Sequence, residues 1–146
     1  MKIISVAGDR VAILLEAKDT NGQYTVMEAT LPPKSGPPSH VHTREDEAFL
    51  VLTGEVTFYL GDKTIVLKKG ESLYAPRNIP HHFKNTGTED AVLLETASPA
   101  GIEDFFVEAG KPLAGRQDRP QPPTAEDIKH MRAIAPNYGL TILPPK

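Results

Sequence analysis

The stretch from Gly36 to Gly54 reads GPPSHVHTREDEAFLVLTG and contains two histidines and three acidic residues. His40 and His42 are two residues apart, and side chains at i and i+2 of an extended strand point to the same face. Neutral imidazole is a common metal ligand, and Glu47 offers a carboxylate a few residues further on. The stretch therefore predicts either part of a metal site or a surface turn with two solvated histidines.

A second stretch, Gly70 to Asn85, reads GESLYAPRNIPHHFKN and contains two more histidines. Four of the five histidines of the chain thus lie in two short stretches, which favours the metal site. His81 and His82 are adjacent, so in a regular strand they point to opposite faces and only one of them can face a shared site.

Together the two stretches resemble the two sequence motifs of the cupin superfamily. The first motif corresponds to His40-x-His42, four residues, Glu47, six residues and Gly54, and the second to Gly70, five residues, Pro76, then His81 and Asn85. The resemblance implies an all-β fold, the cupin double-stranded β-helix or jelly-roll barrel. It also implies that His40, His42, Glu47 and His81 are the metal ligands, and it selects His81 over His82.

Two positions depart from the cupin pattern. Asn78 stands where the second motif usually has glycine, and Gly36 lies closer to His40 than the usual leading glycine does. Asn tolerates a left-handed turn, so the first departure is mild. Neither departure removes a ligand, and Asn85 is expected to bond nearby backbone.

The strand pattern independently predicts an all-β protein. Ten short segments rich in β-branched residues are separated by turn signals such as Asn21-Gly22 and Gly61-Asp62. They are residues 3–7, 10–17, 23–31, 39–41, 47–52, 56–60, 64–68, 72–75, 80–85 and 91–96. Periodicity alone does not separate a jelly roll from an immunoglobulin-like sandwich. The cupin resemblance is what favours the jelly roll.

The character of the chain changes after Pro99. We expect residues 1–98 to form the barrel and residues 99–146 to form a C-terminal tail that packs on it within the same domain. Helices are predicted for residues 102–109 and for residues 124–135, where Thr124 can cap the start. Residues 111–123 read as a linker or an extended arm, and residues 138–143 as a last extended piece.

The identity of the carboxylate ligand depends on local geometry. Glu45 and Asp46 are neighbours of Glu47, and a single bulge after His42 would change which of the three faces inward. The resemblance favours Glu47, which leaves Glu45 and Asp46 on the rim of the site. A second possibility is that Glu45 or Asp46 replaces Glu47 as the ligand.

An apolar pocket is expected beside the metal. If Glu47 points inward, alternation places Phe49 and Val51 on the same face, and Phe83 follows the second-motif histidine on its face. Phe58 is also expected to point inward from its strand. These residues predict either a pocket for a planar aromatic or largely apolar substrate or a plain barrel core.

Composition limits the other functions. The net charge of −3 and the absence of a basic cluster argue against nucleic acid and anionic membranes as partners. With no cysteine, a metal must use histidine and carboxylate. Apolar runs are far shorter than the roughly 20 residues of a membrane span. The start MKIISVAGDR does not resemble a signal peptide, so a cytoplasmic location is expected.

The tail resembles that of the small bacterial quercetin 2,3-dioxygenase-like cupins in its Phe-Phe element and its closing Tyr-Gly. This resemblance implies one divalent transition metal per chain (Fe, Mn, Ni, Co, Cu or Zn), O2 as co-substrate, and Glu47 as both ligand and catalytic base. Two alternatives stay open, an isomerase or lyase acting on a small oxygenated substrate and a non-catalytic metal- or small-molecule-binding protein. Cupins commonly pair, so a homodimer is expected, through residues 10–17 or 111–123.

Overall fold

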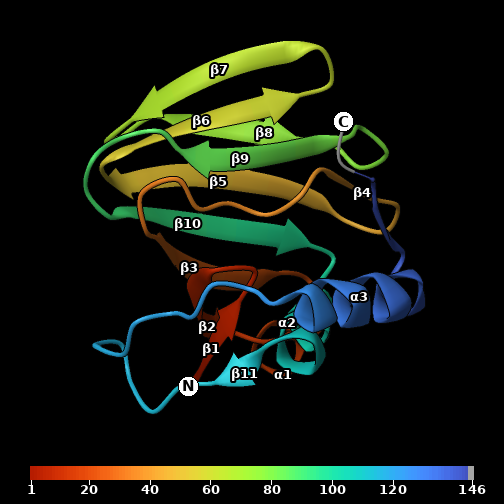
Figure 1. Cartoon of the computed structure of the whole chain (residues 1–146). Helices are drawn as coiled ribbons and strands as arrows, with labels where there is room; N and C mark the ends of the chain where they lie inside the picture. The colour runs from red at the N-terminus through yellow and green to blue at the C-terminus, as the bar shows by residue number, and fades with distance from the viewer. Residues whose placement is uncertain (145–146) are drawn as a thin grey trace.

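Two antiparallel sheets face each other in the computed structural model, which describes residues 1–144 (Figure 1). The strands are β1 (Lys2–Val6), β2 (Asp9–Leu15), β3 (Thr25–Leu31), β4 (His40–His42), β5 (Asp46–Thr53), β6 (Glu55–Leu60), β7 (Lys63–Lys68), β8 (Ser72–Ala75), β9 (His81–Asn85), β10 (Ala91–Ser98), β11 (Lys111–Pro112) and β12 (Leu140–Ile142). One sheet has the order β11-β1-β2-β3-β10-β5-β8, and the other has the order β12-β4-β9-β6-β7. This is the expected double-sheet jelly roll.

The core lies between the inner faces of the two sheets. Phe49 of β5, Phe58 of β6 and Phe83 of β9 are buried, and their ring centroids lie 5.1 to 5.6 Å apart. Rings at these separations pack edge-on or tilted, and burying each side chain stabilises the fold by roughly 1.5–3 kcal/mol. The alternation predicted for these strands is therefore confirmed, because inward residues are apolar on both sheets.

All ten predicted strands are present, with ends within two residues of the expected ones. Gly61 has φ 60° in the loop between β6 and β7, as the first residue of a type II′ turn requires. Asn78 has φ 69°, which explains how Asn can stand at a glycine position of the second motif. A short helix, α1 (Ala17–Thr20), was not predicted. It is stabilised by a capping box in which the Asp19 carboxylate accepts from the Glu16 backbone N–H.

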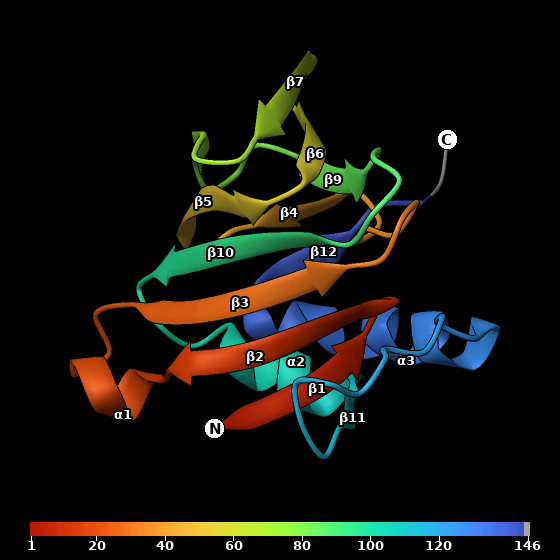
Figure 2. The ribbon, with the colours of Figure 1, turned by 90° about the vertical axis from the view of Figure 1, so that its left-hand side faces the viewer.

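The tail joins both sheets. Helix α2 (Glu103–Ala109) contacts β1 and α3 (Ala125–Ile134), and Figures 1 and 2 show both helices beside β1, away from β6 and β7. The expected cap is confirmed, because Thr124 Oγ1 accepts from the Asp127 N–H at 3.1 Å. A 3-10 turn (Ala135–Tyr138) leads into β12, which pairs with β4.

Strand β11 comes from the segment expected to be an arm and adds to the edge of β1. Strand β2 lies between β1 and β3, so it offers no free backbone edge to a second copy of the chain. The division into residues 1–98 and 99–146 stays a prediction, and its last two residues lie outside the described part. Within residues 1–144, no helix has the length and apolar character needed to cross a membrane.

Candidate metal centre and cavity

The four predicted ligands meet between the two sheets. His40 and His42 lie on β4, and His81 lies on β9, where it is the register partner of His40. Glu47 comes from β5 in the facing sheet. All four side chains are buried, and one ligand atom from each lies within 4.8 Å of the others. The antiparallel pairing thus brings together residues that are up to about forty positions apart in the chain.

The spacing of the donor atoms suits a metal ion. Glu47 Oε1 lies 2.9 Å from His42 Nε2 and 3.0 Å from His81 Nε2. Two adjacent ligands of an octahedral ion, each about 2.1 Å from it, are about 3.0 Å apart. Neither contact of Glu47 has the geometry of a hydrogen bond, so among the described residues Glu47 Oε1 and His81 Nε2 are buried without a hydrogen-bond partner. Buried polar atoms are rarely left so, and a shared divalent cation would satisfy both of them.

The outer nitrogens of two histidines are held by the surrounding chain. His40 Nδ1 donates to the Pro38 carbonyl at 2.8 Å, because a carbonyl can only accept. His42 Nδ1 donates to Glu45 Oε1 at 2.7 Å. Both contacts leave Nε2 free to face the centre, as in the carboxylate–histidine–metal arrangements that orient ligands in proteins.

The three acidic neighbours take different positions in the structure. Glu47 enters the cluster, whereas Asp46 lies outside and accepts from the Arg77 backbone N–H at 2.8 Å. The expectation that Glu45 lies on the rim was wrong, since only 3% of its surface is exposed. It packs behind His42 because the chain turns tightly between β4 and β5, which brings the residue three positions after the histidine back onto its ring.

Charge is unevenly shared within the cluster. Burial lowers the pKa of His42, but the nearby carboxylates of Glu47 and Glu45 outweigh burial and raise it to about 10. Burial, with the charges of His81 and His42, lowers the pKa of His40 to about 3. Burial raises the pKa of Glu47, but His42 and His81 outweigh it and hold that pKa well below its usual range. Glu47 is therefore ionised, and His40 presents a neutral lone pair.

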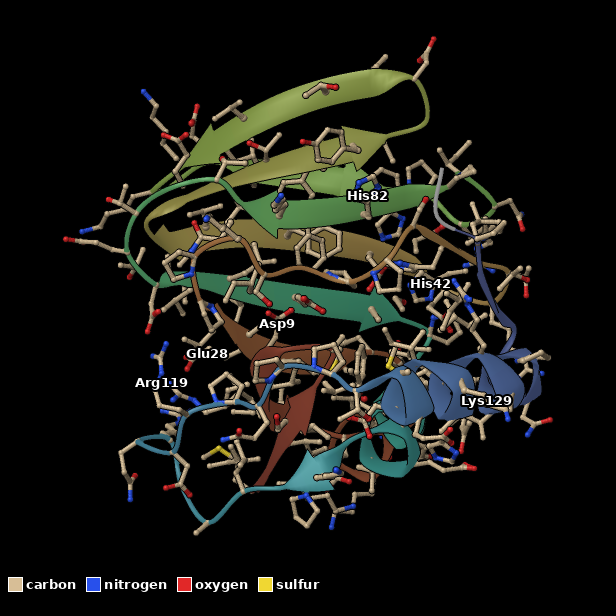
Figure 3. The ribbon with its side chains drawn as sticks, viewed as in Figure 1. Asp9, Glu28, His42, His82, Arg119 and Lys129 are labelled. Carbon is tan, nitrogen blue, oxygen red and sulfur yellow. The ribbon has the colours of Figure 1, made fainter. Side chains whose placement is uncertain are left out.

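The two remaining histidines lie apart from the cluster. His82 is on the opposite face of β9 (Figure 3) and stacks on Tyr59 with ring centroids 4.4 Å apart. His130 lies on α3, where its Nε2 bonds the Glu108 carbonyl at 3.0 Å. Asn85 donates to the carbonyls of Leu31 and Glu89, in agreement with the backbone role expected for it.

A cavity of about 60 Å³ opens beside the cluster. It is lined by Val6, Ala7, Asp9, Val11, Ala29, Pro37, Pro38, His40, His42, Glu47, Phe83, Glu95, Phe105, Phe106, Met131, Leu140 and Ile142. Of the four predicted pocket residues, Phe83 lies in this wall, while Phe49, Val51 and Phe58 pack in the core behind it. Their role towards a substrate stays a prediction.

Sequence reasoning missed two acidic residues of the wall, Asp9 and Glu95. A signal for Glu95 was available, because it shares the inward phase of Ala91, Leu93 and Ala97 along β10. A carboxyl in that phase faces the interior of the barrel. Asp9 precedes the apolar part of β2 and carried no such signal. The contributions of α2, α3 and β12 also depend on how the tail folds back.

The chain is similar in sequence to a known protein family and to several characterised proteins. The model of the cupin domain family matches residues 27–97, which include all four members of the cluster. Quercetin 2,3-dioxygenase of Bacillus subtilis is 27% identical over 111 residues, which cover 75% of this chain and 33% of that protein. Polyketide synthase CurC of Streptomyces cyaneus is 28% identical over 100 residues, which cover 68% of this chain and 60% of that protein.

The chain therefore spans about a third of the length of the dioxygenase that it matches. Among solved structures, a predicted oxalate decarboxylase from Thermotoga maritima aligns with a TM-score of 0.62 and 26% identity. That alignment covers 67% of this chain and 90% of the other. The part left uncovered in this chain is about a third of its length.

Proposed function

We propose, from the premise that this chain belongs to the cupin superfamily, that it is a metal-dependent dioxygenase acting on a small aromatic or flavonol-like substrate. The observation that carries the proposal is the pair of buried, unpartnered donor atoms, Glu47 Oε1 and His81 Nε2, within a group of four ligand-type residues. His40, His42, Glu47 and His81 would hold one divalent transition metal. The likeness to the Bacillus dioxygenase supports the reaction class.

A bound metal of this class supplies a Lewis acid that polarises a coordinated oxygen. The chain's own residues do the remaining work. Glu47 would take the proton of a substrate hydroxyl as general base. Glu45 holds the His42 ring in place, and Phe83 with Phe105 presents an apolar wall that excludes water from the reacting group.

The size of the cavity favours a second candidate. Pockets for drug-sized ligands usually measure about 300–1,000 Å³, whereas this cavity measures about 60 Å³. A flavonol would require the side chains of α2 and β12 to move aside. An isomerase or lyase acting on a smaller oxygenated substrate would need no such movement. A non-catalytic binding protein is the third outcome that an experiment must separate.

Oxygen uptake separates these functions. The protein is loaded in turn with Fe, Mn, Ni, Co, Cu and Zn, and oxygen consumption is followed with catechol and with a flavonol. We expect Glu47→Gln to lower the rate by roughly 10²–10⁴-fold, the usual contribution of a positioned base. Glu28→Gln is the matched control, because Glu28 is half-buried on the opposite face of β3 from the core residue Met27.

Three results would contradict the dioxygenase proposal or the role of Glu47 in it. Metal-dependent turnover without O2 would favour the isomerase or lyase. Binding without turnover would favour the binding protein. Unchanged oxygen uptake in Glu47→Gln would remove Glu47 as the base. We also keep two further proposals for the protein, a cytoplasmic location and a homodimer.

A further inference from the structure

The cavity has a second polar region besides the metal cluster. Asp9 and Glu95 both line it, and each side chain is about 95% buried. In the β5–β10 ladder, Ala97 pairs with Glu47 and Glu95 pairs with Phe49, so Glu95 is the diagonal neighbour of Glu47 on the inner face. Asp9 comes from β2, and Figure 3 shows it apart from His42.

These two carboxyl groups make few hydrogen bonds with the rest of the protein. Within the described part of the chain, no hydrogen bond reaches the Glu95 carboxyl, although the side chain lies in the cavity wall. Asp9 Oδ1 accepts from Ser35 Oγ at 2.5 Å, which leaves its second oxygen free. A carboxyl that borders a cavity and takes no hydrogen bond from the protein there can exchange one with a ligand in that cavity.

The wall also limits the chemistry of that ligand. Three carboxyl groups, those of Asp9, Glu47 and Glu95, line the cavity, and no lysine or arginine is among its described lining residues. Arg119 and Lys129 are exposed and lie at the outside (Figure 3). The described lining therefore holds no lysine or arginine that would pair with a carboxylate or a phosphate of a ligand at Asp9 and Glu95. A hydroxyl group can both donate and accept, so it can bond a carboxyl in either protonation state.

We propose that Glu95 and Asp9 form a hydroxyl-binding subsite that holds the part of the substrate remote from the metal cluster. The substrate class is then a neutral molecule with two oxygen functions, one at the cluster and one at this subsite. The inference rests on the proposed function for the first of these contacts. The second contact is a property of the cavity itself and can be measured without any reaction.

The test compares two probes that differ by one hydroxyl, propan-1-ol and propane-1,3-diol. Both are small enough for the cavity. Their dissociation constants are measured by NMR titration of the Met131 methyl signal, because Met131 lines the cavity. Wild type, Glu95→Leu and Glu95→Gln are each titrated in the metal-free form and with Zn, which has no redox chemistry of its own.

In Glu95→Leu we expect the affinity for propane-1,3-diol, relative to that for propan-1-ol, to fall by about 3- to 10-fold. This is the usual value of one hydrogen bond. Glu95→Gln should keep the wild-type ratio, because an amide also donates and accepts. Glu28→Leu is the control and should keep it too. The melting temperature of Glu95→Leu should not fall, whereas it would fall if Glu95 only supported the fold.

Asp9→Ala provides a second variant and should shift the ratio in the same direction. The proposal is overturned if neither Glu95→Leu nor Asp9→Ala changes the ratio by more than twofold. It is also overturned if neither probe moves the Met131 signal of the wild type. Failure of the dioxygenase proposal would instead appear as absent oxygen uptake with the ratios intact. The two proposals therefore fail by different measurements.

Discussion

Replacing Asp9 with Asn should remove a titration that makes the folded protein less stable as pH rises. Asp9 is buried at the start of β2, and burial raises its pKa to about 7 from an ordinary value of 3.8, against the opposing effect of the Ser35 hydrogen bond. The other titratable groups around the cavity are His40, His42, Glu47 and Glu95. Asn keeps the oxygen that accepts from Ser35 and cannot ionise.

Proton linkage gives the size and the sign of the effect of Asp9 on the free energy of unfolding. Well below pH 3.8 the carboxyl of Asp9 is protonated in the folded and unfolded chain alike, so it has no effect on the pH dependence. Between about pH 4 and pH 7 the unfolded chain ionises first, and the free energy of unfolding falls by about 1.4 kcal/mol for each pH unit. The total is on the order of 4 kcal/mol, and the loss is complete once pH passes the folded pKa of about 7.

The assay is urea unfolding of metal-free wild type and Asp9→Asn at pH values from about 4 to 8, the range that the linkage argument covers. The free energy of unfolding of the wild type should fall relative to that of the variant across this range. The histidines and the other carboxyls titrate in both proteins, so the difference reports Asp9 alone. Asp62→Asn, in the exposed turn after β6, is the control and should leave the pH profile unchanged. Parallel profiles for wild type and Asp9→Asn would refute the reasoning, since they would mean that Asp9 titrates alike in both states.

Three other predictions concern the metal and the assembly. The double variant His40→Ala/His42→Ala should lose most bound metal in elemental analysis while keeping its β-sheet circular dichroism, and full occupancy would contradict the ligand assignment. Glu45→Gln should weaken metal binding by about 10–100-fold in a competition titration with a chelator, the usual effect of removing the partner of a ligating histidine, and an unchanged affinity would leave Glu45 without this role. Sedimentation at micromolar concentration should give a mass near twice 15.9 kDa, and a mass near 15.9 kDa would exclude the homodimer.

Local patterns in the sequence were enough to predict the strands and the four residues that meet in the cluster. The period-2 alternation and the turn residues placed all ten predicted strands, because these signals depend only on neighbouring residues. The two histidine motifs, through their resemblance to those of the cupins, indicated His40, His42, Glu47 and His81. Antiparallel pairing of β4 with β9 brings His40 beside His81, and β5 of the facing sheet adds Glu47.

Only the tertiary structure decided what surrounds the cluster. Glu45 lies behind His42 because of the turn between β4 and β5, and no pattern specified which way its side chain would face. The cavity wall combines Asp9 of β2 and Glu95 of β10 with Phe105 and Met131 of the tail, segments distant in sequence. Contacts of this kind depend on how sheets curve and helices fold back. Their energies are summed over the whole packed molecule, so no short stretch of sequence carries them.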